Sequence, residues 1–414
     1  MKKKKIFIIG GGLCGCLLAY MLSKKKYDIT IFEKNKNLIS SYDSIKIGKF
    51  KMNNGFHGIE LPRSKKIFYF FQNQLKIKFK ILNIKRLILF QRSIINSNAK
   101  INEWPKNIIS NLKPKIDYYK KQNVDFFFKK KIINLFKINS KKFLGNENDS
   151  AKYFLPWFLP SDIIHQSNDE GDKFRSKLRN KTIKGKFALP KNNLFNIIKK
   201  KIFIYLKSNN VKIVFNAEAV LKKNNIEIYK KEKKINTDKV KKIYYTLPAI
   251  FLIKYFDKEH FQKFYQYKKN FLNCLIEIND SNFKSDFSEI LTLNKKIWFV
   301  NKIYSLNYLK FNMPNKKKYL IIEIILDKEK LDKKKIQALL NEIKIIFKFN
   351  YRPKLIDYKL TRSIFYLNNK WIEKSLRILK NISLNKKIIY TSTFGPINMN
   401  KVWIEATKMN KILR

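Results

Sequence analysis

The chain of 414 residues contains only three cysteines, Cys14, Cys16 and Cys274, and no long stretch free of charge. Two of the cysteines lie in one apolar segment with no second pair elsewhere, so neither a disulfide framework nor a structural zinc site is indicated. Lysines interrupt every hydrophobic stretch before it reaches the roughly 18 residues of a membrane-spanning helix. We expect a soluble, cytoplasmic protein without a bound metal. The sequence leaves open whether the protein contacts a membrane peripherally.

The sequence also has few acidic residues, and it contains no motif of the common hydrolases or nucleoside triphosphatases. With 31 acidic and 90 basic side chains, the formal net charge is +59, a value that ordinarily suggests a nucleic-acid partner. The lysines are, however, spread evenly and accompany a similar excess of Asn, Ile and Phe, residues with A/T-rich codons. Our hypothesis is that the charge records an A/T-rich genome, and we expect no nucleic acid as partner.

Hydrophobic residues make up 45% of the chain and aromatic residues 14%, enough for packed cores in two domains. The lysines at positions 2 to 5, followed by an apolar stretch and LCGC, are similar to a signal peptide. The apolar stretch nevertheless continues through a helical pattern into DITIFE, which is typical of a second strand. We therefore expect this segment to belong to the fold.

The N-terminal pattern predicts a strand over 4–9, a helix over 13–25 and a parallel second strand over 28–33. Residues 80–184 show no clear strand alternation and suit an aromatic, partly helical insertion that faces a substrate. The other predicted elements are a helix that begins at Pro62, a helix over 192–208 followed by a strand and a hairpin, a buried strand stopped by Pro248, an alternating strand over 319–326, a helix over 333–347, and a closing strand and helix after 386.

Three glycines carry the strongest chemical signal. Gly10, Gly12 and Gly15 have G-x-G-x-x-G spacing between the first strand and the helix, which suits a tight turn, close approach of a pyrophosphate, and packing of helix on strand. Glu33 ends the second strand, 18 residues after Gly15, where a carboxylate can bind the adenosine ribose and repel a 2′-phosphate. The alternative is a glycine-rich turn in an α/β protein that binds no nucleotide.

Five segments together resemble the superfamily of FAD-dependent amine oxidases, protoporphyrinogen oxidases and phytoene desaturases, which includes UDP-galactopyranose mutase. They are the N-terminal unit, NNGFHGIE, the stretch from GKFALP to AEAVLKK, VKKIYYTLPAIFL, and IIYTSTFGPINMNKVWIEATKMNKIL. The resemblance implies FAD as cofactor. It assigns the following residues to FAD binding: Gly10, Gly12, Leu13, Gly15, Glu33, Lys34, Gly55, Val220, Gly395, Ile397, Asn398 and Met399.

The chain departs from the superfamily at two places. The paired glycines and arginine that usually follow the ribose carboxylate are absent from KNKNLISSYDSIKIG, and Ser392 and Thr393 replace the expected glycine and charged residue of the last strand. Arginine is scarce, so Arg63 and Arg362 are candidates for gripping an anionic substrate, since only arginine offers a planar fork. His57, in the flavin-proximal motif, is a candidate proton carrier, although ordinary structural roles remain open for all three.

The sequence thus predicts an α/β protein with a Rossmann-like FAD domain, three-layered and with a mostly parallel sheet, and an inserted α+β substrate domain. The FAD domain is expected over 1–60, 185–250 and 380–414, and the substrate domain over 61–184 and 251–379. The predicted function is hydride transfer from a small-molecule substrate to flavin. An anionic substrate is one of the options. A non-redox UDP-sugar mutase and a non-catalytic nucleotide-binding relative are the alternatives. Nothing indicates the oligomeric state.

Overall fold

The structure, a computed structural model, describes much of the chain on either side of a long gap. The described residues are 4–25, 27–53, 58–90, 93–96, 106, 185–222, 225–235, 237, 240–280, 283–293, 300–309, 311, 317–326, 331–365, 369–381, 387–391 and 399–412. None of the helices in these ranges is long and apolar enough to cross a membrane.

Five parallel strands form the sheet of the first domain, in the order β10-β2-β1-β14-β20. β1 has β2 on one side and β14 on the other, so the order of strands along the chain reverses beside β1. The sheet is assembled from distant segments: β1 (Lys4–Ile9), β2 (Tyr27–Glu33), β10 (Lys212–Phe215), β14 (Val240–Tyr245) and β20 (Ile388–Tyr390).

Both faces of this sheet are covered, which makes three layers. Ile6 and Ile8 of β1 point into a core with α1 (Leu13–Ser23), α8 (Asn196–Ser208) and α13 (Met399–Lys411). Phe7 and Ile9 alternate to the other face, as strand geometry requires. There they contact a layer made of β11 (Ala217–Lys222), β12 (Asn225–Lys230), β13 (Lys233–Ile235), α9 (Ile250–Ile253), α10 (Lys258–Lys263), the 3-10 turn η6 (Phe264–Tyr267) and α12 (Asn369–Lys380).

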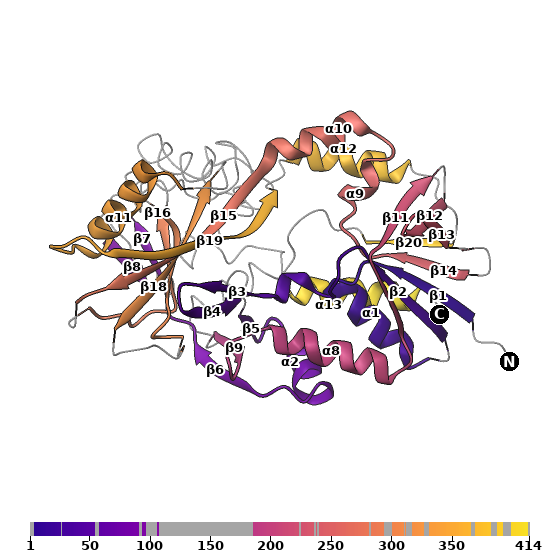
Figure 1. Ribbon diagram of the computed structural model, residues 1–414, viewed down its shortest axis with the longest axis horizontal. Coiled ribbons are helices and arrows are strands. Elements are labelled where there is room, and N and C mark those ends of the chain that lie inside the picture. Colours follow the sequence, from indigo (N-terminus) through magenta and orange to yellow (C-terminus); the bar gives the residue numbers. More distant parts are fainter. Residues whose placement is uncertain are drawn as a thin grey trace.

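The second domain is built on a seven-stranded sheet, at the left of Figure 1, in the order β19-β15-β18-β17-β16-β7-β8. One face packs against α11 (Lys333–Phe347), and the opposite face contributes Leu275, Tyr304, Tyr319 and Ile321 to the core shared with the first domain. The strands are β7 (Arg86–Phe90), β8 (Ser93–Asn96), β15 (Lys268–Ile278), β16 (Glu289–Leu293), β17 (Val300–Ser305), β18 (Lys318–Leu326) and β19 (Lys354–Phe365).

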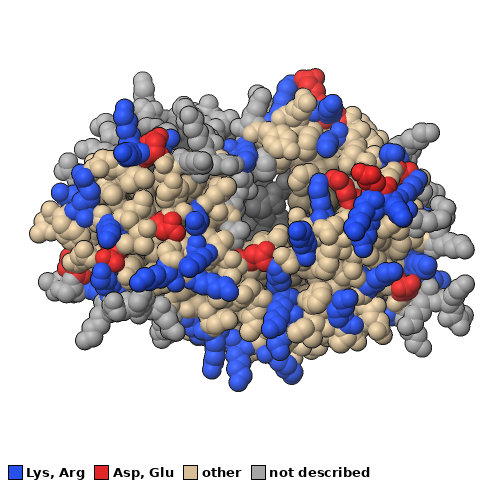
Figure 2. Space-filling model, viewed as in Figure 1, with Lys and Arg blue, Asp and Glu red and all other residues tan. Residues whose placement is uncertain are grey.

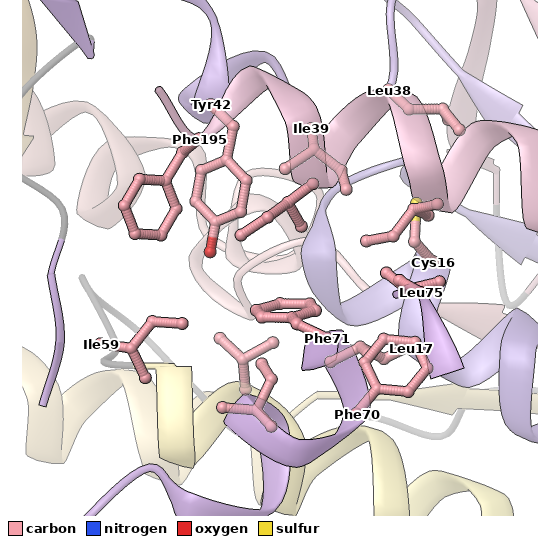
Figure 3. Close-up of a cluster of buried hydrophobic side chains, with 14 of the residues drawn as sticks. Cys16, Leu17, Leu38, Ile39, Tyr42, Ile59, Phe70, Phe71, Leu75 and Phe195 are labelled. Carbon is pink, nitrogen blue, oxygen red and sulfur yellow. The ribbon is translucent and has the colours of Figure 1, made fainter. Parts of the chain in front are cut away.

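Smaller elements fill the space where the two domains meet. Figure 3 shows part of the shared core, in which the rings of Tyr42 and Phe195 meet edge to face at 5.3 Å and Phe71 lies nearby. These elements are the turn η1 (Ser40–Tyr42), the hairpin β3 (Ser44–Ile47) and β4 (Phe50–Asn53), the helix α2 (Lys65–Tyr69) with the π-helix η2 (Phe70–Gln74), and a sheet of β5 (Ile59–Leu61), β9 (Lys186–Pro190) and β6 (Phe79–Asn83).

The predicted fold class, with its three-layer Rossmann-like domain and second domain, is confirmed. The helix over 333–347 is also confirmed, residue for residue. Its N-cap Asp332 accepts a hydrogen bond from the Lys335 N–H at 2.8 Å, a contact that stabilises helices by about 1 kcal/mol.

Four sequence predictions are wrong. The helix expected at Pro62 begins at Lys65, because residues 62–64 form a turn in which the Lys65 N–H bonds to the Pro62 carbonyl. The helix expected from Asn192 begins at Asn196, after a turn with Asn193 at φ +62°. β18 is buried on both faces, because α11 and the first domain cover it. Three strands, β6 (Phe79–Asn83), β7 (Arg86–Phe90) and β8 (Ser93–Asn96), lie where no sheet was expected.

Candidate functional site

The turn between β1 and α1 is the centre of the candidate site. Gly10 has φ +101°, a conformation that side chains rarely adopt, and its N–H bonds to the Phe32 carbonyl at 2.8 Å. A Cβ atom on Gly15 would lie 2.0 Å from the Gly10 carbonyl oxygen, whereas a Cβ on Gly12 would meet nothing within 4 Å. Gly10 therefore makes the turn, Gly15 lets the helix pack on it, and Gly12 borders open space.

The open space lies at the N-terminus of α1. Gly12 is the N-cap and Leu13 the first helical residue; no side chain caps this end, and its first turn holds no acidic residue. The first N–H groups of a helix lack intrahelical partners, and the helix dipole favours negative charge beside them. The arrangement suits a phosphate or pyrophosphate.

Glu33 closes the turn from the adjacent strand. Its side chain is buried; one carboxylate oxygen accepts the Gly11 N–H at 2.6 Å and the other accepts the Asn35 N–H at 2.8 Å. A carboxylate has about four acceptor positions, so two remain for a ligand. Glu33 thus both stabilises the glycine turn and offers acceptors where ribose hydroxyls are expected.

Thr246, directly after β14, also holds the turn, a role that the sequence did not suggest. Its hydroxyl lies 2.8 Å from the Ile9 carbonyl oxygen and 3.1 Å from that of Gly10. The same hydroxyl would be 2.9 Å from a Cβ on Gly10. A threonine after a short buried strand is a weak signal, because its partners come from a strand more than 230 residues earlier.

A cavity of about 390 Å³ opens at the carboxyl ends of β1, β2 and β14. This is where the strand order reverses, the place at which open α/β sheets bind their ligands. Its size falls within the range of ligand pockets. Glu33 lies on one side and aromatic rings form much of the rest: Phe32, Tyr245, Phe251, Tyr255, Phe261 and Tyr265. The last four lie on α9, η6 and their neighbours, residues that the sequence assigned to the substrate domain.

The strand β11 forms another wall of the cavity. Ala217, Glu218 and Ala219 line it, whereas Val220, the residue expected there, is half-buried and is not part of the lining. Lys34 lines the cavity too, and its ammonium pairs with Glu218 at 2.7 Å. Both side chains are more than half exposed, so this ion pair contributes little stability.

Most of the residues expected near the flavin ring lie outside the described residues. This holds for Gly55 and His57 and for Gly395, Ile397 and Asn398. Met399 is the first residue of α13 and packs at the edge of the shared core. Arg362 pairs with Phe271 within the ladder of β19 and β15, and its side chain is likewise outside the description.

Arg63 lies in a buried group of charges between the domains. One of its terminal nitrogens is 3.4 Å from the Glu60 carboxylate, and Glu60 also lies 3.5 Å from Arg86. Arg86 in turn forms a buried ion pair with Glu289 of β16. The Arg63 Nε atom is buried without a hydrogen-bond partner. Two arginines and two glutamates balance, so Arg63 has a counter-charge in the protein without any substrate.

The two cysteines of α1 are free thiols beside the turn. Burial, with a contribution from Glu405, raises the pKa of Cys14 to about 12, and burial raises the pKa of Cys16 further. Both therefore stay protonated at neutral pH, and neither is a ready nucleophile. Within the described residues, no group of three or more His, Cys, Asp or Glu side chains could hold a metal ion.

Fold and site together define a protein built on a Rossmann-like nucleotide-binding domain. Residues 8–73 match the family model described as an NAD(P)-binding Rossmann-like domain. No curated protein sequence matches the chain.

Solved structures share the fold over the whole chain. A proposed protoporphyrinogen oxidase from Exiguobacterium has a TM-score of 0.68 at 11% identity, with 100% of this chain and 99% of that chain covered. A reduced UDP-galactopyranose mutase gives 0.69 at 13% identity, covering 100% and 94%. A putrescine oxidase double mutant with redesigned cofactor binding gives 0.57 at 10% identity, covering 100% and 99%. At these identities the similarity shows the fold.

Proposed function

We propose that the chain is an FAD-dependent oxidoreductase that takes a hydride from a small-molecule substrate. The observation that carries the proposal is the cavity at the reversal of strand order, with Glu33 on one side and the open N-terminus of α1 beside it. The fold shared with a proposed protoporphyrinogen oxidase and a putrescine oxidase supports the same class.

The residues fit the ADP half of FAD. Gly12 leaves room for the pyrophosphate, because even an added Cβ would meet no atom within 4 Å. The two unused acceptor positions on Glu33 suit the ribose hydroxyls, and the negative charge disfavours a 2′-phosphate. The aromatic wall offers faces on which a purine can stack.

When bound, FAD supplies the hydride acceptor, and the chain supplies position and environment. Thr246 and Glu33 fix the glycine turn, so the N–H groups at the start of α1 are held in place before binding. Tyr245 and Phe261 contribute aromatic rings to the cavity wall. His57, Arg63 and Arg362 remain our candidates for handling the substrate, together with the assignments at Gly395, Ile397, Asn398 and Met399 for the flavin.

Titration calorimetry on the purified full chain tests the cofactor. FAD should bind most tightly, while ADP and NAD⁺, which share its ADP half but lack the flavin, should bind more weakly. FMN, which lacks the adenosine, and NADP⁺, which carries a 2′-phosphate, should bind at least about tenfold more weakly than FAD. Glu33→Ala should lose FAD binding, whereas Glu259→Ala, at an exposed acid of α10, should retain it. Equal binding of FMN, or no binding of FAD, overturns the proposal. FAD bound tightly but never reduced would favour the non-catalytic alternative.

A second candidate function is a flavin-dependent mutase that acts without net redox on a UDP-sugar. The observation that favours it is the TM-score of 0.69 to the reduced mutase structure. Reduced protein incubated with UDP-galactopyranose should then yield an isomeric product, separable by chromatography. If no product forms, while the oxidised protein is reduced by an organic donor, the oxidoreductase is retained.

A further inference from the structure

Two segments that meet in the fold contain no acidic residue. Residues 61–90 and 185–216 hold 13 lysines and two arginines but no Asp or Glu, in a chain with 31 acidic side chains. The segments are joined by the pairing of β6 with β9 and by the Lys191 N–H, which bonds to the Lys78 carbonyl at 3.1 Å. An A/T-rich genome favours lysine along the whole chain, so it does not explain why acids are missing from these two neighbouring segments.

The helices of these segments, α2 and α8, lie on the same side of the molecule. The Tyr20 ring of α1 contacts Phe70, which directly follows α2, with centroids 4.4 Å apart, and Tyr205 of α8 at 5.0 Å. Figure 1 shows both helices along the lower edge of the molecule. Lysine and arginine side chains gather along that edge in Figure 2, with no acidic side chain among them. The two helices thus contribute to one strongly basic surface.

The outward side of α8 combines charge with an exposed apolar side chain. Ile202 is buried against the core, whereas Lys200 and Lys201 are exposed and Ile204 is 52% exposed. Ile204 follows the two lysines by four and three positions, so the three side chains are neighbours on the helix surface. Lys207, three positions further on, extends the same stripe and is exposed as well.

α2 has the same arrangement. Tyr69 is 45% exposed and follows the exposed Lys65 and Lys66 by four and three positions. Within the described residues, none of the five lysine side chains on these two helix surfaces forms an ion pair. We call the outward side chains of the two helices the basic face. Its members are Lys65, Lys66, Tyr69, Lys200, Lys201, Ile204 and Lys207.

The acidic side chains that adjoin the two helices are already paired. Asp43 forms an ion pair with Lys199, the half-buried lysine of α8. Glu60, which precedes α2, lies 3.4 Å from Arg63 and 3.5 Å from Arg86. The charge of the basic face is therefore not balanced by neighbouring acids, and an anionic partner would be attracted to it.

We propose that the basic face docks the protein on the surface of an anionic phospholipid membrane. Lysines beside such a membrane are attracted by its negative surface potential, and apolar side chains among them enter the boundary between headgroups and acyl chains. Ile204 and Tyr69 stand in the position for this, and tyrosine has the apolar body and polar tip that suit the boundary. A nucleic acid would gain from the lysines but not from an exposed isoleucine.

The basic face and the cofactor cavity lie on opposite sides of the five-stranded sheet. Tyr245 and Phe261 of the cavity wall belong to the core on one face, whereas α8 packs into the core on the other face through Ile198 and Ile202. A membrane against the basic face would not cover the cavity. The proposal therefore does not depend on FAD.

Co-sedimentation of the full chain with lipid vesicles is the test. Because the net charge is +59, attraction to anionic lipid alone is not diagnostic, and the variants decide. We use vesicles of phosphatidylcholine with about 30% phosphatidylserine at about 150 mM NaCl. The double variant Lys200→Ser, Lys201→Ser should bind them at least about tenfold more weakly than the wild type, and Lys65→Ser, Lys66→Ser should do the same.

The matched control lies on α11, in the second domain. Lys333 and Lys334 are adjacent exposed lysines, and Ile345 of the same helix is 57% exposed. Lys333→Ser, Lys334→Ser lowers the net charge by the same amount as the variant in α8, yet it should change vesicle binding by less than about twofold.

The apolar contact has a readout of its own, because Ile204→Ser leaves the charge unchanged. This variant should weaken vesicle binding by at least about threefold, since an apolar side chain no longer enters the boundary. Ile345→Ser is its control and should bind like the wild type. All substituted side chains are exposed, so the melting temperatures should stay within about 2 °C of the wild type, which confirms that the variants fold.

Three results would overturn the proposal. Equal losses in the lysine variants of α8 and α11 would show that only the net charge matters. Unchanged vesicle binding by Ile204→Ser would mean that no apolar side chain enters the membrane. A basic face that binds a short DNA duplex but not vesicles would identify a nucleic acid as its partner.

Discussion

Gly12 and Gly15 lie three residues apart, yet an added methyl group would meet different surroundings at each. In Gly15→Ala the methyl carbon would collide with the Gly10 carbonyl oxygen, 2.0 Å away. We expect Gly15→Ala to lower the free energy of unfolding by about 1–3 kcal/mol, as overpacking does, and also to weaken FAD binding, because the turn must shift. Urea denaturation and calorimetry measure the two effects.

Gly12→Ala is the counterpart of that variant. Nothing lies within 4 Å of the added carbon, so the stability of the ligand-free protein should change by less than about 0.5 kcal/mol. FAD binding should nevertheless weaken at least about tenfold, because the methyl group occupies space reserved for the pyrophosphate. Normal FAD binding by Gly12→Ala would place the pyrophosphate elsewhere.

The spacing of three glycines and the offset of Glu33 are local features, so the sequence was sufficient to predict them. The bonds that complete the site were not predictable in this way. The Glu33 contact with the Gly11 N–H depends on the register of two strands, and the aromatic wall depends on where residues 251–265 return to the sheet. Likewise, the scarcity of arginine drew attention to Arg63, but its pairing with Glu60 follows from the tertiary fold.

At the scale of elements, α10 is attached to α12 through His260. The imidazole stacks on the Trp371 ring with centroids 4.6 Å apart, and its Nε2 lies 2.9 Å from the Ser375 hydroxyl. That hydroxyl donates to the Trp371 carbonyl, so the His260 Nε2 must be the donor to it. Nε2 therefore carries a proton, and because burial lowers the pKa of His260, the imidazole is the neutral Nε2–H tautomer at neutral pH.

His260 should make the stability of the protein fall in mild acid. Burial, and secondarily the charge of Lys374, lowers its pKa below the usual 6.5. The unfolded chain therefore binds a proton before the folded one does, and stability is lost as the pH falls below about 6.5 toward the lower folded-state pKa. The difference in unfolding free energy between wild type and His260→Gln, from urea titrations, should shrink between about pH 7.5 and pH 5.5. A constant difference would refute this.

The ion pair between β7 and β16 supports a prediction of its own. Arg86→Leu leaves Glu289 buried without its counter-charge and should lower the unfolding free energy by about 3–5 kcal/mol. The double variant Arg86→Leu, Glu289→Leu removes both charges and should be more stable than the single one. Urea denaturation of the two proteins is the measurement. A double variant less stable than Arg86→Leu would mean that Glu289 has another essential partner.

Elements were predictable where one pattern decided their limits. The apolar pattern predicted the helix over 333–347, and the structure shows what limits it: Asp332 caps its start and Lys348 ends it in a left-handed conformation. β18 was located correctly, but its burial on both faces depends on α11 and the first domain. β7 joins β16 some 200 residues later in sequence, and no local signal predicts such a partner.

At the scale of the whole molecule, charge is the dominant feature. Figure 2 shows lysine and arginine side chains spread over both halves, with few acidic ones among them. A net charge of +59 makes the compact state repel itself. We expect the melting temperature to rise by several degrees between about 20 mM and about 300 mM NaCl, as screening shortens the Debye length. Sucrose at equal osmolarity is the control, and a melting temperature that falls with salt would contradict the expectation.

A first domain assembled from distant segments was predicted from the resemblance of those segments to one superfamily, and the N-terminal strand and the closing strand do belong to the same sheet. The exact division of residues between the two domains was harder to predict from the sequence. Ile250, Phe261 and Trp371 lie in the core on the five-stranded sheet, although they fall at or beyond the boundary expected at 250. Contacts between distant segments decide such boundaries, and a hydropathy pattern does not contain them.

The order of strands in the five-stranded sheet has a consequence for how the protein is made. β1 leaves the ribosome first, yet its neighbour β14 begins only at Val240, 231 residues after Ile9. At typical rates of 5–20 residues per second, one edge of β1 waits on the order of 10–50 s for its partner. During this time the apolar strand Ile6–Ile9 is an open template for other chains. The nascent protein should therefore need a chaperone more than its final stability would suggest.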